Sequence, residues 1–172
     1  MSITIPLDRR APARVALAVL RHSGWFVAIV VAIAGGLLLC AVTASDVNLA
    51  GLAGGFTLHA LVGLVGSFAL HEAAHTGALR RAAPGIRSIT LTLTGLRMSL
   101  TPAGTIVGKQ IAFVALMGPL LTAAAGAVLW ATVPDLRLHL WFIGHVVFLA
   151  PCFGDGRAII TGARRWSSSV EL

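Results

Sequence analysis

Charged residues are scarce in this chain of 172 residues. They make up 11% of it, whereas hydrophobic residues make up 57% and the mean hydropathy is +0.90. A soluble globular domain needs roughly 25% charged residues, so the composition excludes that class. The chain also has only two cysteines, which provide neither a disulfide framework nor a C-x-x-C metal motif. These absences leave a polytopic membrane protein as the predicted class.

The charges that are present are mostly positive. The net charge of +7 and the isoelectric point near 11.5 raise the question of nucleic-acid binding. However, the basic residues flank apolar runs and do not form a stripe with interleaved aromatic residues, which a nucleic-acid-binding surface would show. We therefore expect no nucleic-acid partner and take the lipid bilayer as the surroundings of the chain.

Four apolar runs approach the roughly 20 residues that a membrane-spanning helix needs. They lie at about residues 24–44, 50–79, 111–133 and 138–160. We therefore predict an all-α polytopic membrane protein with about four transmembrane helices. The first run could instead be a signal peptide, because Val42-Thr43-Ala44 resembles a cleavage site. Its length exceeds the usual apolar region of about 7–15 residues, so we expect it to stay uncleaved.

The basic residues also predict the orientation. All but one of the 13 Lys and Arg residues lie before the first run, between the second and third, or around the end of the fourth. Because positive loops stay cytoplasmic, we expect both termini and the loop at residues 80–110 to be cytoplasmic. The chain then divides into a basic segment at 1–23, a transmembrane core at 24–160 and a tail at 161–172. The richness in Ala, Gly and Arg favours a bacterial inner membrane.

The loop between the second and third runs has a period of two. Apolar residues alternate with polar ones from Ile89 to Leu100, apart from a break at Thr94-Gly95. This pattern predicts a short β-hairpin associated with the membrane, after the second transmembrane helix. An irregular interfacial loop is the alternative.

Residues 71–75 read H-E-x-x-H inside the second apolar run. On a helix, His71 and His75 lie one turn apart on the same face, so both imidazoles can bind one Zn²⁺ ion. Glu72 lies beside them and could take a proton from a metal-bound water and return it to a leaving amine. Ionisable groups at membrane depth are costly and usually functional. The motif therefore predicts a catalytic zinc site. The alternative is that the three residues only form hydrogen bonds and ion pairs with one another inside the helix bundle.

A catalytic zinc site needs a third protein ligand. Asp155 is the preferred candidate, because it lies near the cytoplasmic end of the fourth run, at about the depth expected for His75. Pro151 should break the helix there, and irregular backbone at membrane depth usually lines a cavity. His145 is an alternative ligand from the same run. A carboxylate paired with Arg157 or solvated by headgroups is the alternative role for Asp155.

An H-E-x-x-H motif on one transmembrane helix and an Asp-Gly pair on a later one, here residues 155–156, resemble the site-2 protease family of intramembrane zinc metalloproteases. The order of a preceding span, a β-like loop and an intervening span is also similar, so the resemblance covers most of the chain. It implies that His71, His75 and Asp155 bind zinc and that Glu72 activates water. It further implies hydrolysis of a peptide bond in a membrane-spanning or membrane-associated substrate, near the cytoplasmic leaflet.

The chain departs from the family's usual pattern in two places. The family often has an Asn shortly before its Asp-Gly and another in Gly-Pro-x-x-Asn, whereas residues 118–122 here read Gly-Pro-Leu-Leu-Thr. Thr122 and His145 are the candidates for binding substrate in place of these amides. The chain is also too short for the PDZ domain of many relatives. We therefore expect substrate choice to depend on the membrane core, the hairpin, a regulatory partner or a homo-oligomer.

Two other functions remain open. A non-catalytic zinc-binding scaffold is favoured by the missing amides and opposed by the intact Glu72. A small transporter or channel subunit that relays ions would need polar residues along a path across the bilayer. The ionisable residues here cluster near one face instead, so we place proteolysis first.

Overall fold

The computed structural model describes residues 2–94 and 97–171, and it is mostly helical. Its elements, in chain order, are β1 (Ser2–Pro6), α1 (Ala11–His22), α2 (Gly24–Ala44), α3 (Val47–Leu58), a π-helical segment (His59–Gly66), α4 (Ser67–Ala82), β2 (Ile86–Thr94), β3 (Arg97–Val107), α5 (Gly108–Thr132), a 3-10 turn (Pro134–Leu136), α6 (His139–Ile143), a 3-10 segment (Gly144–Leu149), α7 (Gly154–Arg164) and β4 (Ser169–Glu171).

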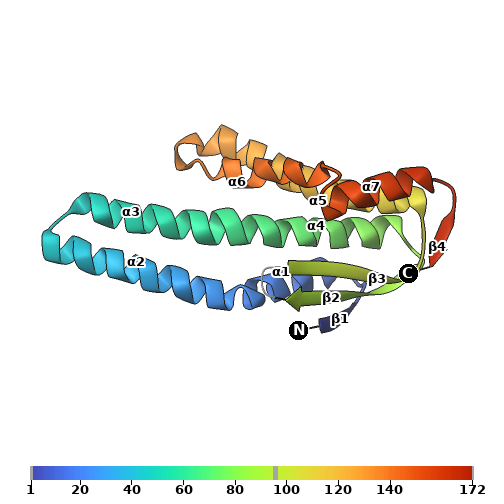
Figure 1. Cartoon of the computed structure of the whole chain (residues 1–172), viewed down its shortest axis with the longest axis horizontal. Coiled ribbons are helices and arrows are strands. Elements are labelled where there is room, and N and C mark those ends of the chain that lie inside the picture. The colour runs from blue at the N-terminus through green and yellow to red at the C-terminus, as the bar shows by residue number, and fades with distance from the viewer. Residues whose placement is uncertain (1, 95–96, 172) are drawn as a thin grey trace.

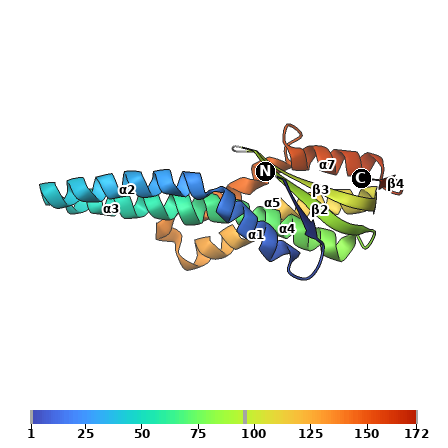
Figure 2. The same ribbon diagram turned by 90° about the horizontal axis from the view of Figure 1, so that it is seen from below.

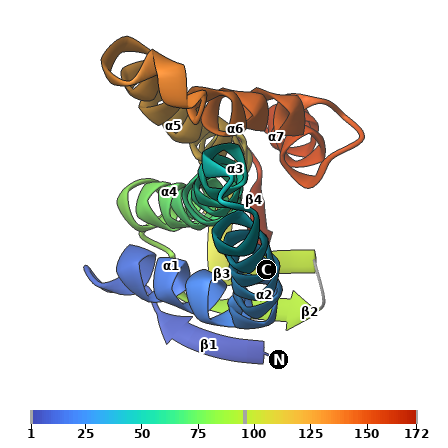
Figure 3. The same ribbon diagram turned by 90° about the vertical axis from the view of Figure 1, so that its left-hand side faces the viewer.

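The elements form three layers (Figures 1 and 3). Helices α3 and α4 run through the middle. Helices α5, α6 and α7 cover one side of them, and α1, α2 and strands β1–β3 cover the other. Both ends of the chain lie beside the sheet, in the same half of the molecule.

Helix α2 has the bounds predicted for the first apolar run, Gly24–Ala44. It ends where Ser45 adopts the left-handed conformation, with φ 52°. Asp46 then caps α3, because its carboxylate accepts a hydrogen bond from the Asn48 backbone N–H at 2.8 Å. This two-residue turn lays α2 antiparallel against α3, and the pair extends away from the rest of the molecule (Figure 2).

The second predicted span is one continuous helix of 36 residues, Val47–Ala82, and so is longer than expected at both ends. It consists of α3, the π-helical segment and α4. Within the π-helical segment, the indole of Trp141 fills the space that a Cβ would need at Gly63. The indole Nε1 also donates a hydrogen bond to His59 Nδ1 at 2.9 Å. The π-helical segment therefore fits closely against α6.

The third predicted span corresponds to α5, but the fourth is broken. Helix α6 with its 3-10 segment is separated from α7 by residues 150–153, and the two parts enclose a bend of 41°. Pro151 has no N–H to donate, and the carbonyl of Ala150 lies where a Cβ of Gly156 would be. The described residues thus contain three helices long and apolar enough to cross a membrane, or four if the bent pair forms one span.

The alternating segment forms β2 and β3, which pair antiparallel with Leu91 opposite Leu100. Both strands extend beyond the predicted hairpin, and its turn at residues 95–96 lies outside the described residues. Strand β1 pairs with β2 and β4 pairs with β3, which gives a sheet of order β1-β2-β3-β4. The two outer strands correct the all-α prediction, because residues near both ends of the chain complete a four-stranded sheet.

The main buried core lies between this sheet, α1 and the end of α4. Ile89, Leu91 and Leu93 are at most 1% exposed and belong to one cluster with Val15 of α1 and Leu79 of α4. The period of two in β2 thus reflects one strand face that packs on helices. The sheet supports the part of α4 that directly follows the H-E-x-x-H motif.

Candidate metal centre

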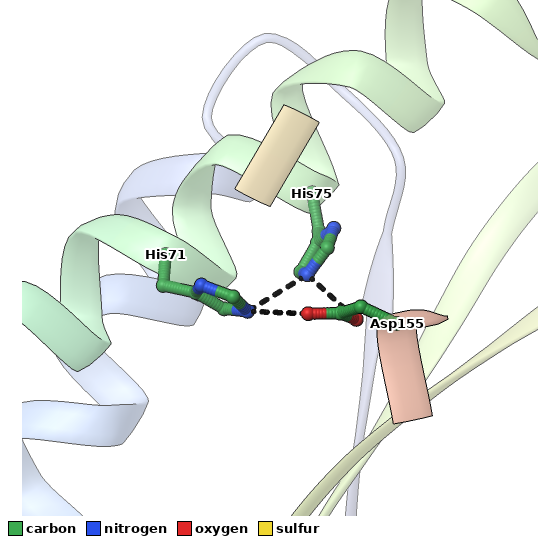
Figure 4. A group of neighbouring side chains, drawn as sticks. All are labelled: His71, His75 and Asp155. Carbon is green, nitrogen blue, oxygen red and sulfur yellow. Dashed lines mark hydrogen bonds and ion pairs between the residues drawn. The ribbon is translucent and has the colours of Figure 1, made fainter. Parts of the chain in front are cut away.

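Helices α4 and α7 bring three side chains to one point (Figure 4). His71 and His75 lie one turn apart on α4, with their Nε2 atoms 2.9 Å apart. Asp155 on α7 places Oδ2 at 3.1 Å from His71 Nε2 and Oδ1 at 3.2 Å from His75 Nε2. Across the described ranges, this is the one group of three His, Cys, Asp or Glu side chains whose ligand atoms all lie within 4.8 Å of one another. The three predicted metal ligands therefore lie together.

Helix α5 also contacts His75. A Cβ at Gly118 would overlap the His75 imidazole, so the glycine leaves room for the ring. The Val114 carbonyl accepts a hydrogen bond from His75 Nδ1 at 2.7 Å. Because a carbonyl can only accept, Nδ1 carries the proton and the lone pair of the neutral ring lies on Nε2. The nitrogen that faces His71 and Asp155 is thus the one able to bind a metal.

The break before α7 determines where Asp155 lies. Phe153 has an extended conformation, and α7 begins at Gly154, so Asp155 belongs to the first turn of the helix. The Phe153 ring packs edge-on against Phe148, with centroids 5.1 Å apart. The close approach of Gly156 to Ala150 then holds the start of α7 against the preceding segment. The Asp155 carboxylate is directed towards α4 as a result.

The donor set fits a metal ion such as zinc. Imidazole nitrogen and carboxylate oxygen bind Zn²⁺ at about 2.0–2.2 Å, and in a tetrahedral site these lengths separate the ligand atoms by about 3.3 Å. The two Nε2 atoms are 2.9 Å apart, and each lies 3.1–3.2 Å from a different oxygen of Asp155, which is close to this value. The group could therefore hold a metal ion with only small shifts of the side chains.

A cleft of about 490 Å³ opens beside the three ligands. Glu72, His75 and Asp155 are among the residues that line it, and residues of β3, α5 and α7 form most of its walls. The β3 wall is mostly apolar, whereas α7 contributes the exposed Arg157, and the exposed Arg165 follows the end of α7. Glu72 is partly exposed while His71 and His75 are only 4% and 8% exposed. The carboxylate predicted to act as a base thus lies where the cleft meets the ligand group.

The two residues predicted to bind substrate in place of the usual amides are both buried. Thr122 is fully buried, and its hydroxyl donates a hydrogen bond to the Gly118 carbonyl of its own helix at 2.9 Å. His145 is 3% exposed, and its Nδ1 lies 3.0 Å from His71 Nδ1. Neither residue lines the cleft described above. Substrate binding by Thr122 or His145 stays a prediction. His145 also lies outside the three-ligand group, so its alternative role as the third ligand is not favoured.

Several residues around the centre were not predicted. Ser67 lies one turn before His71 on α4 and contacts His145, with Ser67 Oγ 3.1 Å from His145 Nε2. Its spacing in the sequence, four residues before His71 and eight before His75, is a signal that could have identified it. The Val114 carbonyl belongs to the backbone, so no side-chain pattern could have indicated it.

Three comparisons of the chain, with models of protein families, with curated proteins and with solved structures, find no match.

Proposed function

We propose that the chain is an intramembrane zinc metalloprotease that hydrolyses a peptide bond of a membrane-spanning or membrane-associated substrate near the cytoplasmic leaflet. One observation carries the proposal: Glu72 lines the same cleft as two members of a three-residue group that could hold a metal ion. A structural zinc site is usually closed by four protein ligands, whereas a catalytic one has three and an open position. Three ligands, a neighbouring carboxylate and a cleft match the catalytic kind.

Each residue of the centre has a role in this reaction. Zinc, when bound, would supply the Lewis acid that activates a water molecule and polarises the scissile carbonyl. His71, His75 and Asp155 would hold it. Glu72 would accept the proton that the attacking water loses and then donate it to the departing amine. The burial of the ligands would keep bulk water away from the reacting groups.

Strand β3 is the part of the cleft suited to an extended substrate. On its outer edge, β4 pairs with Thr105–Val107. Four of the β3 residues before that point line the cleft instead: Met98, Ser99, Leu100 and Pro102. Addition of a strand to a sheet edge is a common mode of peptide binding. A substrate helix that unwinds near the membrane surface could pair with β3 in this way. Its extended backbone would then lie next to the metal centre.

We propose four membrane crossings, with both ends of the chain in the cytoplasm of a bacterial cell. The distribution of Lys and Arg supports this orientation. In addition, both chain ends lie beside the sheet, in the same half of the molecule (Figure 1). Arg137 follows α5 and is the one basic residue predicted on the opposite side.

The first test is the metal content of the detergent-purified protein. Wild type should hold about one zinc ion per chain, and His71→Ala and Asp155→Ala should both lose it, because each removes one of three ligands. Glu72→Gln should keep its zinc, since the carboxylate is not part of the ligand group. A wild-type protein that was never exposed to chelator and holds no zinc would overturn the proposal.

The second part of the test measures cleavage of membrane proteins. Membranes from cells that make wild type or Glu72→Gln should be compared by labelling of new protein N-termini and mass spectrometry. Fragments should appear with wild type and be missing with Glu72→Gln, although both variants bind zinc.

A non-catalytic zinc-binding scaffold is the second candidate. It is favoured by the burial of Thr122, the residue that replaces the family's usual Asn, inside α5. This function predicts the same zinc content but identical N-termini with wild type and Glu72→Gln.

A further inference from the structure

His145 is buried beside the candidate metal centre and has a partner at each ring nitrogen. Its Nδ1 lies 3.0 Å from His71 Nδ1, and its Nε2 lies 3.1 Å from Ser67 Oγ. The mechanism proposed above assigns His145 no role. A polar side chain that is only 3% exposed and fully paired nevertheless fixes the positions of protons around it.

The direction of each hydrogen bond follows from one fixed donor. The Ser67 hydroxyl donates its single hydrogen to the Leu64 carbonyl at 2.9 Å. Ser67 Oγ can therefore only accept from His145, so His145 Nε2 carries a proton. In the neutral ring the lone pair then lies on His145 Nδ1, which must accept from His71 Nδ1–H.

This chain of bonds fixes the tautomer of His71. With its proton on Nδ1, His71 directs the lone pair of Nε2 at His75 and Asp155. His75 reaches the same state through the Val114 carbonyl. Two nitrogen lone pairs and a carboxylate then face one another at 2.9–3.2 Å with no hydrogen between them. Such an arrangement is repulsive unless a cation lies among the three groups.

We propose that His145 and Ser67 are positioning residues, which hold His71 in the tautomer that binds the metal. The proposal rests on the zinc site of the proposed function and extends it to two residues outside the ligand group. Metal-binding histidines usually donate their second N–H to a carboxylate, a backbone carbonyl or water. Here an imidazole accepts instead, and it can do so in only one tautomer. Ser67 is needed to select that tautomer.

Packing is a separate role that the experiment must exclude. The ring of Phe148 lies 5.4 Å from that of His71 and 5.2 Å from that of His145, measured between centroids. Phe148 thus contacts both histidine rings without a hydrogen bond to either. Phe148→Leu is therefore the matched control, because it alters the packing and leaves the chain of hydrogen bonds intact.

The test measures zinc affinity by competition with a chelator. His145→Leu removes the acceptor and should bind zinc about 10–100-fold more weakly than wild type. His145→Asn places an oxygen near the former Nδ1 and should recover most of this loss, which a purely structural role would not predict. Ser67→Ala should show a smaller loss, and Phe148→Leu should match wild type.

The second readout is the tautomer itself, from ¹⁵N NMR of the metal-free protein labelled at histidine. The His71 signals are identified by their absence in His71→Ala. They should report Nδ1–H in wild type and in His145→Asn, and a mixture of tautomers in His145→Leu and Ser67→Ala. Thermal unfolding of each metal-free variant checks that it is folded.

The outcomes separate this proposal from the one on which it rests. A wild type that binds no zinc defeats the proposed function. A wild type that binds zinc, beside a folded His145→Leu of equal affinity and unchanged tautomer, overturns only the positioning role. If His145→Leu does not fold, Ser67→Ala decides: affinity and tautomer equal to wild type overturn the proposal, and a loss of both supports it.

Discussion

His71 and His75 are identical side chains one helical turn apart, yet different kinds of group orient them. A backbone carbonyl, that of Val114, accepts from His75. Side chains orient His71, through His145 and Ser67. A backbone group is present whichever residue occupies position 114, so the orientation of His75 should tolerate substitution there. The orientation of His71 depends on the identity of two residues.

Gly118 allows the contact between His75 and α5, and this gives a test at the residue scale. In Gly118→Ala, the new Cβ would occupy the space of the His75 imidazole and displace the ring. We expect zinc affinity to fall by about tenfold or more, as for other changes around metal ligands, in a protein that still folds. Chelator competition measures the affinity and thermal unfolding checks the fold.

The matched control is Gly36→Ala. Gly36 also lies in a helix, but nothing lies within 4 Å of a Cβ built there. This variant should bind zinc as wild type does. Equal affinities for Gly118→Ala and Gly36→Ala would contradict the packing argument.

The sequence predicted part of the centre because part of its geometry is local. His71 and His75 follow from the helical period within five residues, and Asp155 from its matching depth in another span. Ser67 belongs to the same helical face as both histidines and could have been found. The acceptors at Val114 and Leu64 are backbone carbonyls, and the position of His145 depends on how the 3-10 segment packs on α4. The predicted substrate role of Thr122 came from family resemblance and not from its surroundings.

At the scale of elements, Pro102 indicates which backbone groups of β3 face the cleft. Proline has no N–H, so within a paired strand it is tolerated where that position points away from the partner strand. Pro102 lies opposite Ile89 in the β2–β3 ladder. Backbone N–H groups of successive residues in a strand point to alternate sides. The N–H of Leu100 therefore also points away from β2, whereas that of Ser99 points towards it.

Leu100→Pro therefore tests strand addition without breaking the ladder. It removes one N–H on the outer edge, and we expect lower cleavage of a substrate identified by N-terminal labelling, with unchanged zinc content. Ser99→Pro is the contrasting variant, because it should remove a β2–β3 hydrogen bond and lower the unfolding temperature. Full cleavage by Leu100→Pro would argue against pairing of the substrate with β3 at this residue.

The elements that could not be predicted from the sequence are those without a local pattern. Long apolar runs predicted α2, the Val47–Ala82 helix and α5, and the period of two predicted β2 and β3. Strands β1 and β4 have five and three residues, too few for a period to be visible. Their pairing also joins residues that are far apart in the sequence. The break in the fourth span was indicated by Pro151, but the bend between its two parts depends on contacts at Gly156.

At the scale of the whole molecule, the Val47–Ala82 helix is longer than a membrane is thick. At about 1.5 Å per residue, its 36 residues extend about 54 Å, whereas the hydrocarbon core is about 30 Å thick. One end of the helix must therefore leave the hydrocarbon. The end that carries Arg80 and Arg81 is also the end that packs against the sheet. We infer that the metal centre, whose two histidines lie five and nine residues before Arg80, lies near this membrane boundary.

The shared sheet predicts which loops lie on the same side of the membrane. In a protein without its two cysteines (Cys40→Ser, Cys152→Ser), single cysteines at Arg9, Ser168 and Asp135 can be labelled with an impermeant maleimide. Arg9→Cys and Ser168→Cys should react in inverted vesicles, and Asp135→Cys in right-side-out vesicles. Reaction of Arg9→Cys and Ser168→Cys from different sides would exclude the arrangement.

The pairing of β4 with β3 also limits how many times the chain can cross the bilayer. Two strands can share a ladder only if the chain between them crosses an even number of times. If α5, which is long and apolar enough to span a membrane, contributes one crossing, then the segment from α6 to α7 must contribute an odd number. A re-entrant loop, which enters and leaves on the same face, contributes none and would leave β4 on the wrong side. This parity argument supports the proposal that the bent pair is a complete crossing and that the chain crosses four times.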